Sequence, residues 1–368
     1  MTDRLRSMRL FSVVGARPQF VKLAMICRAL KRPDAAASVE HAIVHTGQHY
    51  DAEMNEVFFR DLDIPTPDFH LGIGSGTHGE QTGEMIKRLE PVLSEHRPDW
   101  VLLYGDTNST LAGAIAGAKL GLSIAHIEAG LRSYNRRMPE EINRVVADHL
   151  SDMLLCPTAA AIRNLEKEGL ADRAILCGDI MYDASLCYAN LAETRGGKLA
   201  EQWKPKAFGL ATVHRAENAD DPTRLKSIFE ALEYIAGHIC PVLLPLHPRT
   251  RNALQSCGLS PSRVTVIPPA SYLEMLLLER RARFILTDSG GVQKEAYFAQ
   301  VPCITMRDET EWVETLDNYC NVLTGANTPA IVAAVKNIDR AGPWTAVYGD
   351  GRAAHAILDA LHDQPVRS

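Results

Sequence analysis

Short apolar runs recur along this chain, and each is followed by a stretch in which apolar residues repeat with helical spacing. In the first half the apolar runs are residues 10–15, 41–46, 100–104, 123–127, 153–156 and 174–178. In the second half they are residues 208–213, 242–246, 264–267, 284–287, 303–306 and 321–323. This alternation predicts parallel, doubly wound α/β sheets, because parallel strands need a crossover helix between them.

Two domains are expected, because the alternation occurs twice and is interrupted once. Residues 191–206 contain a Gly-Gly pair and a proline and predict a linker. The linker separates an N-terminal domain, residues 1–190, from a C-terminal domain, residues 207–350. A final helical stretch within residues 351–368 is expected to pack back on the first domain. Residues 62–76 are rich in proline and glycine and predict a loop.

Composition narrows the class of protein. The chain has 368 residues, of which 46% are hydrophobic, and its formal net charge is −6 at pH 7. An acidic chain of this kind is not expected to bind nucleic acid through a broad basic surface. Its eight cysteines form no CxxC pair, and no apolar run approaches the ~20 residues of a membrane span. These features predict a cytoplasmic protein with reduced thiols and with no membrane or nucleic-acid partner.

The stretch RFILTDSGGVQKEA, residues 283–296, predicts a buried strand, a Ser-Gly-Gly turn and a helix. Free N–H groups and the positive end of the helix dipole meet at such a turn, and glycine lets an anion approach the backbone. The stretch has neither a Walker nor a GxGxxG pattern. On these residues alone, phosphate binding and an ordinary strand-to-helix turn both remain open.

Polar side chains collect where the expected strands end, which is the edge where ligands bind in parallel sheets. In the first half these residues are Arg17, Gln48, His49, Asp106, Glu128, Glu140 and Glu141. In the second half they are His214, Arg215, Glu217, His247, Arg249, Asp288, Ser289 and Arg307. Two such edges facing across a cleft would hold an anionic ligand and acid/base groups. A metal site is the alternative, but His126 and Glu128 match no known ligand spacing, so no metal is expected.

Five longer motifs combine many of these positions. They are GDTNSTLAGA (105–114), HIEAGLRS (126–133), MPEEINR (138–144), HRAEN (214–218) and LTDSGGVQKEA (286–296). Their order and spacing resemble the non-hydrolysing UDP-N-acetylglucosamine 2-epimerases over nearly the whole chain. The resemblance implies an α/β protein of two Rossmann-like, doubly wound parallel-sheet domains that face a cleft, a GT-B-like fold. It also implies a UDP-sugar substrate, no cofactor and a homodimer.

The implied reaction inverts C2 of a UDP-2-acetamido sugar without nicotinamide or metal. A base removes the C2 proton while UDP leaves C1, which gives a 2-acetamidoglucal intermediate. UDP then adds back, and an acid delivers a proton to the other face of C2. Such a reaction needs acid and base groups on opposite faces, and cations or N–H groups on the departing diphosphate.

The resemblance assigns acid/base candidates to this chain. Asp106 matches the acidic residue of GDT, Glu128 that of xEAGLR, and Glu140 the first Glu of PEE. His214 matches a histidine that suits protonation of the leaving phosphate. For Glu140, a first-turn helix carboxylate favoured by the dipole is the alternative. Arg144 is expected to hold Glu140 by an i, i+4 pair or to touch the diphosphate.

Other matching residues suit the UDP part of the ligand. They are Arg17, Lys22, Ser289, Gly290, Gly291 and Glu295. The two cations match the family's GxRPxxxxK opening, the Ser-Gly-Gly run resembles a diphosphate cradle, and Glu295 resembles the carboxylate that binds the ribose hydroxyls. For Lys22, a solvated helix position is the alternative.

Two positions depart from the commonest family pattern and bear on the substrate. Gln19 stands where RPE has Glu, and Trp312 stands where TERPE has Arg. Both changes resemble the branch that acts on UDP-2,3-diacetamido-2,3-dideoxyglucuronic acid, with UDP-GlcNAc as the alternative substrate. A neutral Gln19 suits a ligand with a carboxylate, and a flat Trp312 suits an acetamido methyl. A GT-B glycosyltransferase, a hydrolysing epimerase and a non-catalytic UDP-sugar binding protein are the rival functions.

One further departure concerns regulation. Many family members bind a second UDP-GlcNAc through a QHRxM-type motif. In this chain Gln48 and His49 are followed by Tyr50, so the arginine of the motif is missing. We therefore expect no strict need for UDP-GlcNAc as an activator.

Overall fold

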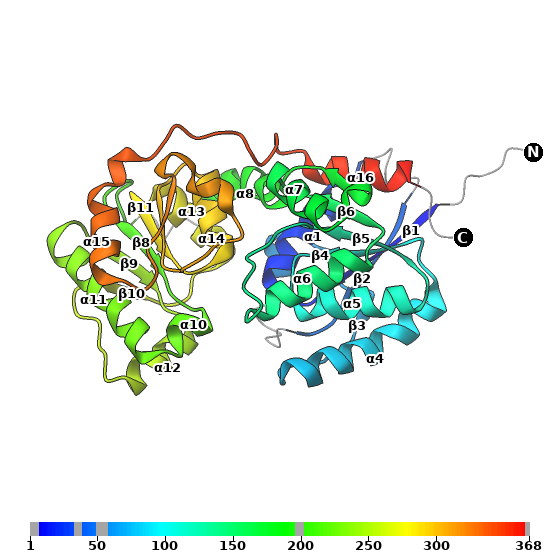
Figure 1. Cartoon of the computed structure of the whole chain (residues 1–368), viewed down its shortest axis with the longest axis horizontal. Coiled ribbons are helices and arrows are strands. Elements are labelled where there is room, and N and C mark those ends of the chain that lie inside the picture. Colours follow the sequence, from blue (N-terminus) through cyan, green and yellow to red (C-terminus); the bar gives the residue numbers. More distant parts are fainter. Residues whose placement is uncertain (1–6, 33–38, 49–57, 196–201, 365–368) are drawn as a thin grey trace, which may run out of the picture. The chain divides into compact units, whose positions relative to one another are not determined.

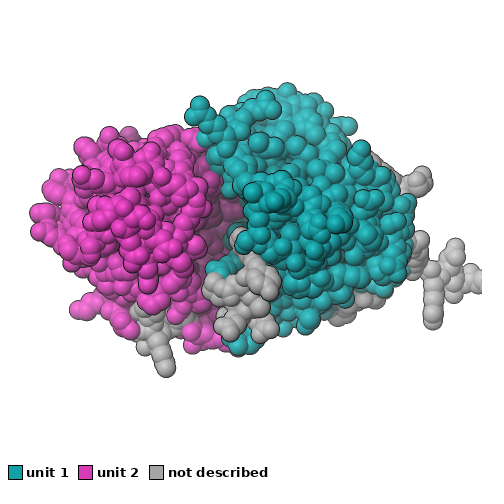
Figure 2. Space-filling model, turned by 90° about the horizontal axis from the view of Figure 1, so that it is seen from below, with its two compact units in different colours: residues 1–184, 346–368 teal, residues 185–345 magenta. Residues whose placement is uncertain are grey.

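Two compact units make up the chain, and each has a parallel sheet and a core of its own. The computed structural model describes residues 7–32, 39–48, 58–195 and 202–364 (Figure 1). Unit 1 comprises residues 1–184 and 346–368, and unit 2 comprises residues 185–345 (Figure 2).

Within the described residues, unit 1 is built on a seven-stranded parallel sheet. Its strands are β1 (Met8–Val14), β2 (Val39–His45), β3 (Phe69–His70), β4 (Trp100–Tyr104), β5 (Ser123–Ile127), β6 (Met153–Cys156) and β7 (Ala174–Leu176). They lie in the order β3-β2-β1-β4-β5-β6-β7, so the chain reverses its direction across the sheet between β1 and β4. β4 and β5 are buried along their whole length, as central strands covered on both faces are.

Helices cover both faces of this sheet. They are α1 (Arg17–Leu30), α4 (His78–His96), α5 (Asn108–Lys119), α6 (Pro139–Leu150), α7 (Ala159–Lys167) and α16 (Ala353–Asp363), with the 3₁₀ turn η1 (Ala171–Arg173). α5 contacts both α4 and α6, whereas α1 contacts α16. The chain crosses from β1 to β2 in one direction and from β4 to β5 in the other, so right-handed crossovers put α1 and α5 on opposite faces. On the α5 face the core includes Leu89, Leu103 and Ala114.

Unit 2 repeats this plan. Its described residues form a six-stranded parallel sheet in the order β10-β9-β8-β11-β12-β13. The strands are β8 (Gly209–Thr212), β9 (Val242–Pro245), β10 (Thr265–Ile267), β11 (Phe284–Thr287), β12 (Cys303–Thr305) and β13 (Asn321–Leu323). The helices are α10 (Ala216–Ala219), α11 (Pro222–His238), α12 (Pro248–Ser256), α13 (Tyr272–Arg281), α14 (Gly290–Phe298) and α15 (Thr328–Lys336), with the 3₁₀ turns η2 (Val313–Tyr319) and η3 (Ile338–Arg340). α11 packs on α15, and Phe229, Leu232 and Val335 lie in the core there.

The expectation of parallel, doubly wound α/β sheets is confirmed, and two local expectations are corrected. Residues 62–76 are not loop throughout, because the edge strand β3 pairs with Val44 and His45 of β2. The linker expected from residue 191 begins later, because α8 (Ile180–Arg195) continues beyond that point. Residues 196–201 of that linker lie outside the described residues. In unit 1, α16 contacts α1.

The cysteines of this fold form no disulfides within the described residues. All eight cysteines lie within the described residues and are free thiols. Burial raises the pKa of the Cys27 thiol and of the Cys303 thiol to about 12, so neither is a ready nucleophile. Among the described helices, none is long and apolar enough to cross a membrane.

A glycine sets how closely the loop after β5 approaches α7. Gly130 has φ +80°, and a Cβ on it would lie 2.5 Å from Ala161 O. Gly121, after α5, has a similar φ of +67°, but no atom lies within 4 Å of such a Cβ. An alanine at either position would have a strained backbone, but only an alanine at Gly130 would also clash with a neighbouring atom. Comparing the two positions therefore distinguishes backbone strain from steric exclusion.

We expect Gly130→Ala to destabilise unit 1 more than Gly121→Ala does. Both variants carry the roughly 1–2 kcal/mol cost of a left-handed alanine. Only Gly130→Ala adds a clash with a backbone carbonyl, which brings its total to about 3 kcal/mol or more. Urea denaturation of the two variants and the wild type measures the difference, and equal losses would contradict the close approach.

Candidate active site

The candidate residues of unit 1 lie where its strand order reverses. α1 follows β1 and carries Lys22, and the turns after β4 and β5 carry Asp106 and Glu128. The first two turns of α6 carry Glu140 and Arg144. The carboxyl ends of neighbouring parallel strands meet at one edge of a sheet. The structure accordingly brings Lys22 to Glu128 and Asp106 to Arg144 at this edge.

Three side chains from three different elements hold the backbone turn of residues 104–106. The hydrogen bonds run from Gln19 Nε2 to Tyr104 O (2.9 Å), from His126 Nε2 to Gly105 O (2.6 Å) and from Asn143 Nδ2 to Asp106 O (2.9 Å). A carbonyl oxygen can only accept, so each of these nitrogens donates. α1, β5 and α6 thereby fix the turn that presents Asp106.

Lys22 and Glu128 form an ion pair beside this turn. The Lys22 ammonium contacts Oε2 of Glu128, and the lysine is only 5% exposed, so it is not a solvated helix residue. A Cβ on Gly105 would lie 2.9 Å from Lys22 Nζ, so glycine leaves room for the ammonium. Glu128 itself has φ +71°, a strained conformation for a residue with a side chain. The N–H groups of Glu128 and Ala129 both donate to Leu155 O and hold the strained backbone in place.

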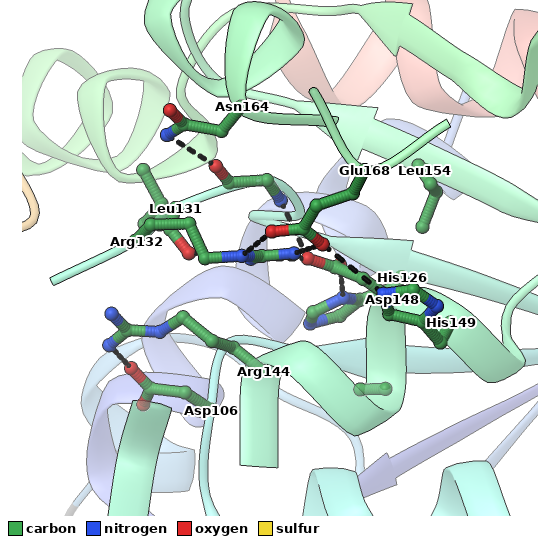
Figure 3. Close-up of polar contacts among 12 residues, drawn as sticks. Asp106, His126, Leu131, Arg132, Arg144, Asp148, His149, Leu154, Asn164 and Glu168 are labelled. Atoms are coloured by element: carbon green, nitrogen blue, oxygen red, sulfur yellow. Dashed lines mark hydrogen bonds and ion pairs between the residues drawn. The ribbon is translucent and has the colours of Figure 1, made fainter. Parts of the chain in front are cut away.

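Asp106 is held by an arginine that bridges two carboxylates. Arg144 Nη2 lies 2.5 Å from Asp106 Oδ2, and Arg144 Nη1 lies 2.9 Å from Glu141 Oε2 (Figure 3 shows the contact with Asp106). Glu141 in turn accepts hydrogen bonds from Ser133 N and Oγ and from Tyr134 N. Arg144 therefore pairs with Asp106 and Glu141, and not with Glu140 as the i, i+4 spacing suggested.

Two further candidates lie in the first turns of helices. Glu140 is half-buried in the first turn of α6, and within the described residues its carboxylate makes no hydrogen bond or ion pair. Arg17 begins α1, and its guanidinium lies 5.8 Å from the ring centroid of Phe58. Both side chains are at the strand-end edge, and their roles toward a ligand stay predictions.

Behind the turn lies a buried cluster of charged side chains to which the sequence assigned no role (Figure 3). His126 Nδ1 lies 2.7 Å from Asp148 Oδ1. The other Asp148 oxygen accepts from Gly130 N (3.1 Å) and from Arg132 Nη1 (2.7 Å). Arg132 also makes two hydrogen bonds of 2.7 Å to the carboxylate of Glu168. The cluster connects β5, the loop that follows it, α6 and the end of α7.

Both ring nitrogens of His126 face groups that only accept. Burial alone would raise the pKa of Asp148, but hydrogen bonds from His126 and Arg132, with their charges, outweigh burial and hold that pKa below its ordinary value. Nδ1 of the ring faces Asp148, and Nε2 faces Gly105 O on the other side. The sequence could have indicated these buried charges, because Glu141, Arg144 and Asp148 are spaced to share one face of α6.

The strand order of unit 2 reverses between β8 and β11, and one carboxylate joins the two strand ends. Asp288, directly after β11, is fully buried. Its oxygens accept from the N–H groups of His214 (3.1 Å) and Arg215 (3.1 Å) and from Asn218 Nδ2 (3.2 Å). The imidazole of His214 remains 43% exposed, with Nδ1 3.7 Å from Asp288 Oδ1.

The Ser-Gly-Gly run starts α14, as the sequence predicted. Ser289 is the N-cap, and its hydroxyl accepts from Val292 N. Gly290 and Gly291 occupy the first helical positions, where N–H groups have no partner within the helix. A Cβ on Gly290 would lie 2.5 Å from Oε1 of Glu311. This buried carboxylate also lies 3.0 Å from Nη2 of Arg307, so a fixed charge pair stands close to the helix start.

The two remaining candidates of unit 2 lie on α14 and in the loop that covers it. Glu295 is half-buried on α14, and burial, followed by the charge of Glu295, raises the pKa of the neighbouring Glu279. Trp312 is buried, and Lys294 Nζ lies 4.0 Å from its ring centroid, a cation–π contact. Trp312 therefore covers a lysine of its own chain, and its predicted contact with a substrate methyl stays a prediction.

The regulatory motif lies only partly within the described residues. Gln48 Oε1 accepts hydrogen bonds from Ser109 N (3.0 Å) and Ser109 Oγ (2.7 Å), which ties it to the start of α5. His49 and Tyr50 lie outside the described residues. The expectation that no UDP-GlcNAc activator is required therefore stays a prediction.

Comparison with known proteins gives consistent matches over nearly the whole chain. A family model described as UDP-N-acetylglucosamine 2-epimerase matches residues 31–362. The UDP-2,3-diacetamido-2,3-dideoxy-D-glucuronate 2-epimerase of Pseudomonas aeruginosa is 50% identical over 362 residues, which cover 96% of this chain and 99% of that protein. The UDP-N-acetylglucosamine 2-epimerase of Methanocaldococcus jannaschii is 42% identical over 365 residues, 96% of this chain and 99% of that protein.

Solved structures match in the same way. A crystal structure of the Methanocaldococcus jannaschii UDP-GlcNAc 2-epimerase in complex with UDP-GlcNAc and UDP has a TM-score of 0.90 at 41% identity and covers 97% of this chain and 100% of that chain. A crystal structure of the Neisseria meningitidis UDP-GlcNAc 2-epimerase bound to UDP-GlcNAc has a TM-score of 0.88 at 28% identity, with 97% and 100% covered.

We expect Arg132→Met to be strongly destabilising at neutral pH, because it leaves Asp148 buried with one cationic partner fewer. The loss of one partner of a buried pair costs about 3–5 kcal/mol. Since the pKa of Asp148 is lowered in the fold, its contribution to stability is present above its ordinary pKa of 3.8 and is lost as the pH falls below that value. The difference in unfolding free energy between wild type and variant should therefore stay constant from pH 7 to pH 4 and narrow as the pH falls below 3.8.

Urea denaturation over this pH range measures the effect. Arg163→Met is the matched control, because Arg163 is exposed on α7 and makes no ion pair within the described residues. It should change the unfolding free energy by less than about 0.5 kcal/mol. A loss for Arg132→Met that does not depend on pH would show that the charge of Asp148 is not what the arginine stabilises.

Proposed function

Because this chain belongs to the UDP-N-acetylglucosamine 2-epimerase family, we propose that it inverts C2 of a UDP-2-acetamido sugar by eliminating UDP and adding it back. The observation that carries the proposal is the pairing at the edge of the unit 1 sheet, where Glu128 contacts Lys22 and Asp106 contacts Arg144. Carboxylates fixed in this way at strand ends suit proton transfer to and from a sugar carbon.

The proposed reaction has two half-reactions that mirror each other. First, a carboxylate of unit 1 takes the C2 proton, the electrons of the C–H bond form a C1=C2 double bond, and the C1–O bond breaks with UDP as the leaving group. UDP then adds back to C1 while a proton reaches C2 from the opposite face. Asp106, Glu128 and Glu140 are the proposed proton carriers. No electrons leave the substrate, so the steps balance without a redox partner.

Unit 2 is proposed to hold UDP. The N–H groups of Gly290 and Gly291 and the hydroxyl of Ser289 suit the diphosphate, and Glu295 suits the ribose hydroxyls as an acceptor. Negative charge grows on the diphosphate as the C1–O bond breaks, and N–H donors at a helix start stabilise such charge. His214, with its exposed imidazole, is proposed to protonate the departing phosphate. Arg17 and Lys22 of unit 1 are the proposed cations for the same charge.

For the substrate itself we propose UDP-2,3-diacetamido-2,3-dideoxyglucuronate, converted to its manno form. The support is the 50% identity to the Pseudomonas aeruginosa enzyme of that name. Gln19 and Trp312 are the two positions at which the sequence resembles that branch. UDP-GlcNAc is the second candidate, because the Methanocaldococcus jannaschii relative is named for it at 42% identity. Because Gln19 and Trp312 contact their own chain, the identity to the first relative carries most of this choice.

We expect Asp106→Asn and Glu128→Gln each to lower kcat by about 10²–10⁴-fold, the usual contribution of a general acid or base. The assay follows epimerisation of a purified UDP-sugar in heavy water, in which the wild type should place deuterium at C2. Asp172→Asn is the control, because Asp172 is an exposed carboxylate of the same unit. If both variants keep full activity, these carboxylates are not the proton carriers, and sugar transfer without deuterium at C2 would favour a glycosyltransferase.

We expect kcat/KM for UDP-2,3-diacetamido-2,3-dideoxyglucuronate to exceed that for UDP-GlcNAc by tenfold or more, about 1.4 kcal/mol of transition-state binding. Initial rates with both purified UDP-sugars, with no other nucleotide sugar present, measure the ratio. Product analysis by NMR checks in the same samples that no free sugar accumulates. A preference for UDP-GlcNAc would reverse the choice of substrate, and steady release of free sugar would replace epimerisation by hydrolysis.

A further inference from the structure

Both the oxygen and the nitrogen of the Gln19 amide make hydrogen bonds, and these bonds join two loops of unit 1. It lies in the first turn of α1 and is only 1% exposed. Its Oε1 accepts from the N–H groups of Gly15 (2.8 Å) and Ala16 (3.1 Å), in the turn after β1. Its Nε2 donates to Tyr104 O (2.9 Å) and to Thr110 Oγ1 (3.1 Å), at the two ends of the turn after β4. These two turns flank the point where the strand order reverses.

The chemistry of the four partners favours a side chain that can both accept and donate hydrogen bonds. Two are N–H groups that only donate, and Tyr104 O only accepts, so the joining side chain must accept on one side and donate on the other. A carboxamide meets both needs, and the partners also fix which end of the amide is oxygen. Asp288 joins the corresponding strand ends of unit 2, but its three partners all donate, so a carboxylate serves there.

The joined segments present the proposed proton-transfer groups. Lys22 follows Gln19 by three residues on α1, so the two lie within one helical turn. The Lys22 ammonium contacts Glu128 and packs against Gly105, the residue between Tyr104 and Asp106. A shift of the β4 turn relative to α1 would therefore move Asp106 and the Lys22–Glu128 pair relative to each other.

We propose that Gln19 is a positioning residue, which locks the turn after β1 to the turn after β4 and so holds Lys22, Glu128 and Asp106 in their reactive arrangement. This inference rests on the proposed function, because it takes these three residues as the reacting groups. It assigns Gln19 a role in the rate for any substrate, whereas a specificity residue would act on the choice between substrates.

Gln19→Glu tests the donor side of this lock. A glutamate would still accept from Gly15 N and Ala16 N, but its second oxygen would face Tyr104 O, and two acceptors repel each other. Protonation would turn that oxygen into a donor with one hydrogen, which restores the hydrogen bond to Tyr104 O while those from Gly15 N and Ala16 N remain. The titratable and charged groups that face this turn include Lys22 on α1, Asp106 after β4, His126 on β5, Glu128 after β5 and Arg144 on α6. Gln19→Met carries no titratable group at this position, so it shows how far their own titration alters the ratio.

We expect the ratio of the variant's kcat to the wild-type kcat to fall about tenfold between pH 5.5 and pH 8.5, with KM little changed. Gln19→Met removes the hydrogen bonds without adding a titratable group, so its ratio should be low and independent of pH. Gln255→Glu adds a carboxylate at an exposed position of α12 and should follow the wild type at every pH. A ratio for Gln19→Glu that stays flat across this range would overturn the lock, as would a change in preference between the two UDP-sugars.

A second measurement does not depend on turnover. The carboxyl group introduced by Gln19→Glu fits the fold when it is protonated and does not fit when it is ionised, so its pKa is raised in the folded variant. Its stabilising contribution is present at low pH and is lost as the pH rises through that raised value. The urea midpoint of Gln19→Glu should therefore fall relative to wild type as the pH rises. If the wild type turned over neither UDP-sugar, the proposed function would fail, and a pH-independent midpoint would separately refute the lock.

Discussion

The ladder of a parallel sheet stops at the end of each strand, and the carbonyl groups just beyond it must find other donors. In unit 1 the three successive carbonyls of residues 104–106 accept from Gln19, His126 and Asn143. Tyr104 O accepts from Thr110 Oγ1 as well (2.8 Å). A buried carbonyl left without a partner costs about 1–3 kcal/mol, so the needs of this turn favour one arrangement of α1, β5 and α6 around it. The candidate carboxylate Asp106 and the Lys22–Glu128 pair take their positions from that arrangement.

The two units join their strand ends through different side chains, and the groups at each edge suit the two parts of the proposed ligand. In unit 2 the strand ends offer N–H groups, which Asp288 binds, and the first amides of α14, which have no partner within the helix, are the proposed donors to an anion. In unit 1 the turn after β4 offers carbonyls, which accept from side-chain donors, and the turn after β1 offers N–H groups, which Gln19 binds. Carboxylates paired with cations lie at the same edge. A diphosphate needs donors, and the proposed proton transfer at carbon needs carboxylates.

Sequence patterns located the strand ends and the Ser-Gly-Gly start of α14 because both depend on neighbouring residues. They did not determine which partners the polar side chains choose, because those choices span the sheet. The i, i+4 spacing predicts that Arg144 pairs with Glu140. In the structure the arginine binds Glu141 and Asp106, and Asp106 lies 38 residues away in the sequence. Gln19 was read as a contact for the substrate, yet Nε2 donates to a carbonyl 85 residues away. Trp312 likewise contacts Lys294 on α14 of its own unit, and no spacing rule predicts a contact between positions 294 and 312.

The buried charges of unit 1 follow from the same backbone requirement. Gly105 O needs a donor, and the imidazole of His126 supplies it from β5, with its other nitrogen facing Asp148. Asp148 is also the acceptor for Gly130 N, in the loop that carries Glu128, so one carboxylate serves two segments of the site. An ionised carboxylate at full burial needs more than one cationic or N–H partner, which explains Arg132, and Glu168 in turn balances the arginine. The series therefore starts at Gly105 O, a neutral carbonyl of the β4 turn, which contacts His126. From there each side chain pairs with the next: His126 with Asp148, Asp148 with Arg132, and Arg132 with Glu168.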